Sequence, residues 1–171
     1  NAIDKLIAAG RVLPGRVDLV ESGVAIAVRK GAHRWPVATE DDVRRAVQSA
    51  ASLSYSTGPS GVYLEQLFKR WGILDEVRPR IVVPPPGIPV GSLVADGKAE
   101  LGFQQLSELM NLPGIDVLGP LPPAIQTLTV FSGGVCAASM SQPQARALLD
   151  FLASPATVEL KRQHGMAPPR G

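Results

Sequence analysis

The sequence predicts an α/β fold in which helices cover a parallel or mixed β-sheet. Strand-like segments alternate with helical segments of roughly ten residues along most of the chain, and such alternation is typical of a sheet covered by helices. Residues 24–28 are all apolar, which favours a central strand buried on both faces. At 171 residues, the chain is long enough for one ordinary domain or two small lobes.

The first elements follow from periodicity and end signals. Apolar residues at helical spacing predict a short helix that ends at Gly10, and a strand is expected from Arg16 to Arg29. Thr39 and Asp42 have the spacing of a capping box, so we expect a helix there with Val43 facing the core.

Residues 52–72 are predicted to form a strand, a tight turn and an amphipathic helix. Leu53 and Tyr55 alternate with serines, as in a strand. Apolar residues at helical spacing follow a Gly-Pro-Ser-Gly turn, and Gly72 ends the predicted helix. The remaining elements expected are strands at Arg80–Val83, Ala99–Gln104, Ile115–Leu118 and Ile125–Ala137, and helices at Val90–Ala95, Leu106–Met110, Gln142–Ala153 and beyond Pro155.

Composition and motifs exclude several function classes. The net charge is +2 without a basic tract, so we expect no nucleic-acid partner. His33 and His164 have no second ligand at a suitable spacing, and we expect neither a metal nor a cofactor. Cys136 lies in an apolar setting and is expected to be a small core residue. No apolar stretch is long enough to span a membrane.

The turn before the second predicted helix is a candidate anion site. The first N–H groups of a helix lack intrahelical partners, and the helix dipole adds partial positive charge there. Gly58 and Gly61 would allow a ligand close to the backbone, and Ser56, Thr57 and Ser60 add hydroxyl donors. The alternative is that Pro59 and Ser60 merely start a helix.

Two further loops are expected at the same edge of the sheet, because each is close to the end of a predicted strand. Gly87 and Ile88 lie in a proline-rich loop that would form a stiff wall. Gln104 and Gln105 offer amides that both donate and accept. The alternatives are a rigid connector for the prolines and solvent-exposed polarity for the glutamines.

Five motifs carry a resemblance to a known family. They are Gly58–Tyr63, Trp71–Ile73, Pro84–Gly91, Gly97–Gln105 and Phe151–Pro155. In these motifs the chain resembles the molybdate-binding-protein-like family of bacterial solute-binding proteins. The resemblance covers essentially the whole chain, and it corresponds to the last two-thirds of such a protein.

The resemblance implies a type II periplasmic-binding-protein-like fold with an incomplete first lobe, whose ligand serines would lie upstream of Asn1. Residues 1–22 would end the first lobe, residues 23–127 would form the second, ligand-binding lobe, and residues 128–171 would hold a crossover strand and C-terminal helices. The implied location is the periplasm, and the implied partners are a small anionic ligand and an ABC permease. Without its companion lobe the fragment would expose apolar surface and could self-associate.

The resemblance also implies site residues. Family members contact an oxyanion through backbone N–H groups at the turn that matches Pro59–Gly61 and at the loop that matches Gly87 and Ile88. A family tyrosine has Gln105 as its counterpart here. That departure disfavours molybdate and fits relatives that handle carboxylates, including a branch that resembles aconitate isomerase.

Three functions therefore stay open. A solute-binding protein for a small oxyanion or organic carboxylate is the first. The second is an isomerase of an unsaturated tricarboxylate, for which the base would be Tyr63, Glu108 or a residue of the missing lobe. The third is the effector-binding domain of a regulator, for which no DNA-binding segment is visible in these residues.

Overall fold

The computed structural model describes residues 2–170, which fall into two compact units. Unit 2 is the continuous segment Gly23–Thr129, and unit 1 consists of the flanking residues up to Ser22 and from Val130 onward. The chain therefore passes from one unit to the other twice. No helix among residues 2–170 combines the length and the apolar character needed to cross a membrane.

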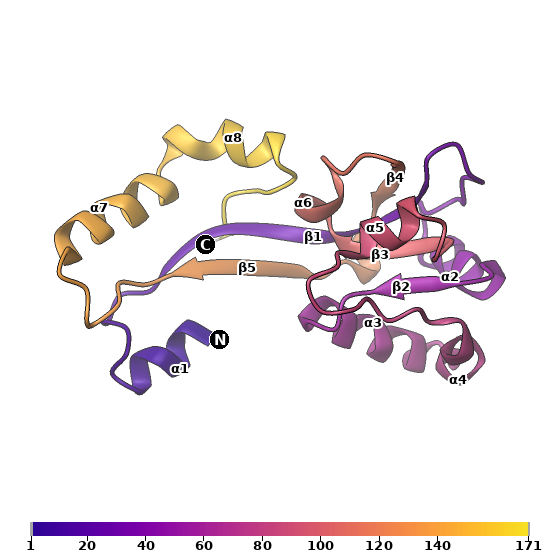
Figure 1. The fold of residues 1–171 in the computed structure, drawn as a ribbon, viewed down its shortest axis with the longest axis horizontal. Coiled ribbons are helices and arrows are strands. Elements are labelled where there is room, and N and C mark those ends of the chain that lie inside the picture. The colour runs from indigo at the N-terminus through magenta and orange to yellow at the C-terminus, as the bar shows by residue number, and fades with distance from the viewer. Residues whose placement is uncertain (1, 171) are drawn as a thin grey trace. The chain divides into compact units, whose positions relative to one another are not determined.

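The strands form one mixed sheet with the order β2-β3-β1-β4, and β5 pairs with β1 (Figure 1). Their bounds are β1 (Val17–Arg29), β2 (Leu53–Tyr55), β3 (Leu101–Gln105), β4 (Ile115–Pro120) and β5 (Leu128–Gly133). β2 and β3 are parallel, whereas β1 is antiparallel to β3 and β4. The predicted α/β class with a mixed sheet is confirmed.

Unit 2 has helices on both faces of its strands because β1 is apolar at consecutive positions. Val24, Ile26 and Val28 pack into one cluster with α2 (Glu40–Ser49) and α3 (Pro59–Arg70). The alternate residues Ala25 and Ala27 pack with Leu109 of α6 (Leu106–Leu109) on the other face. All of these β1 residues are fully buried, as the sequence predicted.

The remaining helices of unit 2 are short. α4 (Leu74–Val77) runs into a 3₁₀ turn, η1 (Arg78–Arg80), and η2 (Pro123–Ile125) precedes β5. α5 (Val90–Ala95) packs closely on β3, because a Cβ at Gly102 would lie 2.5 Å from a methyl carbon of Val94. The capping box of α2 is confirmed, since the Thr39 hydroxyl accepts from the Asp42 N–H at 3.1 Å.

Three predictions are corrected by the structure. The strand expected at Arg80–Val83 is absent from the described chain, where Arg80 ends η1 and only Ile81 forms an isolated bridge to Leu53. The strand expected at Ile125–Ala137 is shorter, because η2 occupies its start and β5 ends at Gly133. Cys136 is exposed and is not a core residue.

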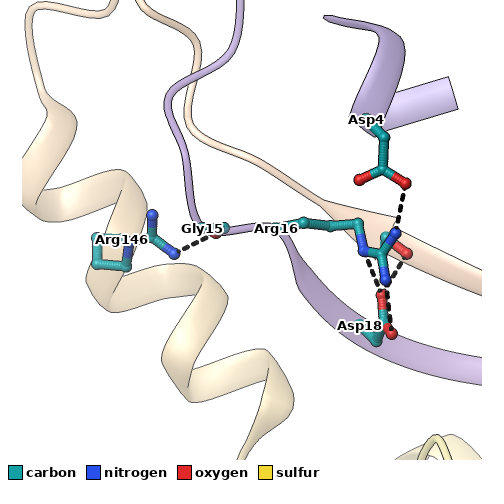
Figure 2. A network of polar contacts seen from close by, with 6 residues as sticks. Asp4, Gly15, Arg16, Asp18 and Arg146 are labelled. Carbon is teal, nitrogen blue, oxygen red and sulfur yellow. Dashed lines mark hydrogen bonds and ion pairs between the residues drawn. The ribbon is translucent and has the colours of Figure 1, made fainter. Parts of the chain in front are cut away.

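Unit 1 comprises α1 (Ala2–Ala8), the first part of β1, most of β5, α7 (Gln142–Ala153) and α8 (Val158–Gln163). Arg16 bridges Asp4 at 2.7 Å and Asp18 at 3.0 Å, and so ties α1 to the start of β1 (Figure 2). Arg146 of α7 donates to the Gly15 carbonyl at 2.8 Å. Polar contacts therefore hold the N-terminal segment of this unit.

Candidate functional site

The connection between β2 and α3 retains main-chain donors at the start of a helix. Gly58 is the N-cap residue and no side chain caps α3. The N–H groups of Gly61 and Val62 both donate to the Gly58 carbonyl, at 3.0 and 3.1 Å. Pro59 has no N–H. The Gly61 N–H is therefore already hydrogen-bonded within the turn. The Ser60 N–H makes neither of these bonds and remains free to bind a ligand.

Two hydroxyl groups lie beside that donor. Ser56 Oγ and Ser60 Oγ are 3.0 Å apart, and Ser60 is buried with 5% of its surface exposed. One hydroxyl donates to the other, so one O–H of the pair stays available to a ligand. Thr57, which the sequence also placed in the site, is exposed next to them.

Gly61 is required by the protein's own backbone and not by ligand access. A Cβ at this position would lie 1.6 Å from the Ser56 carbonyl oxygen. The backbone just before α3 therefore packs against the first turn of the helix without room for a side chain. Gly58 is different, because its nearest neighbour, Ser56 Oγ, would be 3.7 Å from a Cβ. The prediction that Gly61 is a glycine to let a ligand approach the backbone is therefore corrected.

A cavity of about 350 Å³ adjoins this turn. Its lining includes Ser56, Thr57 and Gly61 from the turn and Arg78 and Val83 from the segment after α4. Arg78 is a cation that sequence reasoning missed, and nothing near the turn in the sequence signals it. Of the predicted site residues, Gly58, Ser60, Gly87, Ile88, Gln104 and Gln105 do not line this cavity.

Tyr55 closes one side of the same cavity. Burial raises the pKa of Tyr55 above its ordinary value, and the Glu65 carboxylate, which accepts from the Tyr55 hydroxyl at 3.2 Å, raises that pKa further. The Tyr55 hydroxyl therefore stays protonated at neutral pH, and its proton is donated to Glu65.

The proline-rich loop forms a tight turn. The Ile88 N–H donates to the Pro85 carbonyl at 3.0 Å, and Gly87 has a φ of +79°. A positive φ at the third position with proline at the second is the signature of a type II turn. The Ile88 N–H is therefore already hydrogen-bonded within the turn, whereas the Gly87 N–H takes no part in the hydrogen bond that closes it.

The three predicted segments leave the sheet at one end of unit 2. β2 and β3 run in parallel with Tyr55 opposite Phe103, so Gln104 and Gln105 follow at the level of Ser56 and Thr57. Ile81 also pairs in parallel with Leu53, which directs the chain toward Gly87 at that end. Figure 1 shows the start of α3, the connection into α5, and α6 at this end.

Gln104 and Gln105 are buried, with 7% and 5% of their surfaces exposed. The Gln104 amide nitrogen donates to the Glu108 carboxylate, and the Gln105 amide nitrogen donates to Thr129 Oγ1 at 2.6 Å. Neither Oε1 atom has a hydrogen-bond partner among the described residues. The solvent-exposed alternative is therefore wrong, and both side chains carry an unused polar atom.

The two residues considered as bases differ in their surroundings. The Tyr63 hydroxyl donates to the Ile125 carbonyl at 2.7 Å, and burial raises the Tyr63 pKa. Glu108 is exposed and is held by Gln104. Of the two, only Glu108 presents a basic atom to the outside. Residues 2–170 contain no group of three or more His, Cys, Asp or Glu side chains placed to hold a metal ion.

The fold is shared with solved binding proteins. The substrate-binding domain of a putative molybdenum ABC transporter from Clostridium difficile matches with a TM-score of 0.76 at 16% identity, over 98% of this chain and 73% of that one. The periplasmic molybdate-binding protein of Azotobacter vinelandii matches with a TM-score of 0.70 at 21% identity, over 99% of this chain and 75% of that one. The predicted fold of this class is confirmed.

Sequence comparison gives the family. An aconitate isomerase of Pseudomonas sp is 40% identical over an alignment of 172 positions, which covers 98% of this chain and 64% of that protein. The chain therefore spans less than two-thirds of the length of this relative. The profile of a family described as bacterial extracellular solute-binding protein matches residues 1–167. The chain belongs to the family of bacterial extracellular solute-binding proteins.

Proposed function

We propose that the chain binds a small anionic solute, an organic carboxylate or an oxyanion, in the periplasm and passes it to an ABC permease. The observation that carries the proposal is the uncapped start of α3, where the Ser60 N–H and one hydroxyl of the Ser56–Ser60 pair remain for a ligand. Neutral donors at a helix start stabilise an anion without a permanent ion pair, which suits reversible binding.

The proposed site uses all three segments. From the β2–α3 turn it takes Thr57, Gly58, Ser60 and Gly61, of which Ser60 donates and Gly61 shapes the backbone. From the other segments it takes Gly87 as a main-chain donor, Ile88 as an apolar wall with 45% of its surface exposed, and Gln104 and Gln105 as polar walls. Residues 23–127 would form the lobe that carries these groups, and residues 1–22 and 128–171 would belong to the other lobe.

An organic carboxylate is the favoured ligand. Gln105 stands where the resemblance implies a tyrosine, and a carboxamide suits a planar carboxylate group. The relative named aconitate isomerase adds support, because aconitate is a tricarboxylate. Arg78 in the cavity next to the turn would attract an anion of this kind toward the site.

The second candidate function is an isomerase, which the 40% identity to the aconitate isomerase favours. Moving a proton between carbons of an unsaturated tricarboxylate requires a base that accepts and returns that proton. Within the described residues of this site, we propose Glu108 for the role, since it is exposed and its carboxylate is held by the Gln104 amide.

The test uses the purified protein with trans-aconitate, citrate, molybdate and sulfate. Both the melting temperature and the amount of each compound after incubation are measured. A rise in melting temperature with an unchanged carboxylate supports binding for transport. Conversion of trans-aconitate supports the isomerase, and no response to any of the anions contradicts the proposal.

A matched pair of variants then tests the base. If aconitate is converted, Glu108→Gln should abolish conversion and retain a melting-temperature shift with trans-aconitate, because the side chain keeps its size and loses its basicity. Tyr63→Phe should convert aconitate as the wild type does. Conversion that persists in Glu108→Gln would exclude Glu108 as the base.

A further inference from the structure

The carboxamide of Gln105 is almost fully buried, but only one of its two polar atoms makes a hydrogen bond. It has 5% of its surface exposed, its nitrogen contacts Thr129 Oγ1, and its oxygen has no partner among the described residues. An unpaired buried carbonyl oxygen is unfavourable by about 1–3 kcal/mol. Such groups are uncommon in folded proteins and call for an explanation.

Gln126 shows what a purely structural glutamine looks like in the same unit. Its oxygen accepts from the N–H groups of Val24 and Thr127, each at 2.9 Å. Its nitrogen donates to the carbonyl of Val24 at 3.0 Å and to that of Leu121 at 3.3 Å. Both ends of this carboxamide are bonded to the backbone, so it has one satisfied orientation.

Gln104 also has one orientation, for a different reason. Its amide contacts the Glu108 carboxylate, and a carboxylate can only accept hydrogen bonds. The nitrogen of Gln104 must therefore face Glu108. Its free end is an acceptor and therefore does not donate to a carboxylate.

Gln105 differs from both because its partner is a hydroxyl. A threonine hydroxyl accepts a hydrogen bond or donates one, so Thr129 accommodates either end of the carboxamide.

We propose that the Gln105 carboxamide turns over when the ligand binds, with Thr129 as the positioning residue. Without a ligand, the nitrogen donates to Thr129 and one acceptor is unpaired. With a carboxylate bound, the Thr129 hydroxyl donates to Gln105 Oε1, and Gln105 Nε2 donates to a carboxylate oxygen of the ligand. Both ends of the carboxamide are then paired. The inference rests on the proposed function and specifies that the ligand group at Gln105 is an ionised carboxylate.

The test uses tricarballylate as the probe, because this saturated tricarboxylate has no double bond to isomerise. Gln105→Leu removes the donor to the ligand and should raise the Kd for tricarballylate about fivefold to tenfold, the effect of one hydrogen bond. Thr129→Val removes a hydroxyl that pairs with the carboxamide both with and without the ligand, so its Kd should stay within about twofold of the wild type. Thr129→Ser keeps the hydroxyl and should bind within about twofold of the wild type. Thr127→Val removes a nearby threonine hydroxyl and should leave the Kd unchanged.

A spectroscopic readout separates positioning from a general structural effect. The side-chain NH₂ signals of Gln105 are assigned in a nitrogen–proton NMR spectrum by their loss in Gln105→Glu. Saturating tricarballylate should shift these signals in the wild type and in Thr129→Ser. Unshifted signals with the probe bound, or a Gln105→Leu Kd equal to that of the wild type, would overturn the inference alone. No binding of tricarballylate by the wild type would overturn the proposed carboxylate site as well.

Discussion

Replacing Gly61 with alanine should destabilise unit 2, although alanine is the better helix former. In an unconstrained helix, this change would stabilise by about 1 kcal/mol. Here the new Cβ would lie 1.6 Å from the Ser56 carbonyl oxygen and 3.1 Å from a ring carbon of Tyr55. Tyr55 is the last residue of β2, whose residues are all buried, and Ser56 follows it directly, so the turn has little room to move.

The expected loss is about 3 kcal/mol, the upper part of the range for overpacking, because backbone and not a flexible side chain must shift. For a chain of this length, that corresponds to a fall of roughly 6–12 °C in melting temperature. Urea unfolding followed by tryptophan fluorescence is a suitable assay, since Trp35 and Trp71 both pack against the core of unit 2.

Gly58→Ala is the matched control. Gly58 has a φ of −83°, and a Cβ there would have 3.7 Å to its nearest neighbour. About 0.5–1 kcal/mol should be lost, from the poorer N-cap residue. Equal stability of Gly61→Ala and the wild type, or a gain, would refute the packing of Ser56 against α3 and with it the geometry of the turn.

Three further outcomes follow from the same contacts. Tyr63→Phe should lower the free energy of unfolding by about 1 kcal/mol in urea titrations, because the hydrogen bond to the Ile125 carbonyl is lost; an unchanged value would contradict that bond. Gln126→Leu should lower it by about 3 kcal/mol or more, since the backbone groups of Val24 lose their partners; a loss under about 1 kcal/mol would be inconsistent with their burial. The raised pKa values of Tyr55 and Tyr63 mean that the unfolded chain releases these protons first, so their effect is constant below about pH 10 and stability falls as the pH rises beyond it. Urea midpoints between pH 8 and about 11 check this, and a midpoint that rises above about pH 10 would contradict it.

The sequence predicted correctly those elements whose structure depends on residues close to one another in the chain. The capping box at Thr39 and the apolar run in β1 correctly predicted α2 and a strand covered on both faces. The segment from Arg80 to Val83 misled because its β-branched residues suit a strand. Its continuation is limited by the prolines from Pro84 onward, which lack N–H donors for a ladder.

The site could be predicted only in part, because some of its features depend on residues far apart in the sequence. The uncapped start of α3 is a local feature and was visible in the sequence. Three other features depend on contacts between distant segments: the Ser56 carbonyl against Gly61, the Thr129 hydroxyl on Gln105, and Arg78 beside the turn. No periodicity or motif near the turn carries that information, and the exposure of Cys136 was hidden by its apolar neighbours in the same way.

A crystal structure of the protein grown with tricarballylate tests the central claim most directly. We predict a carboxylate oxygen within about 3 Å of the Ser60 main-chain nitrogen. A second contact should reach the Ser56–Ser60 hydroxyl pair. A ligand bound elsewhere on the molecule, with a side chain of the protein itself bonded to the Ser60 N–H, would contradict the claim.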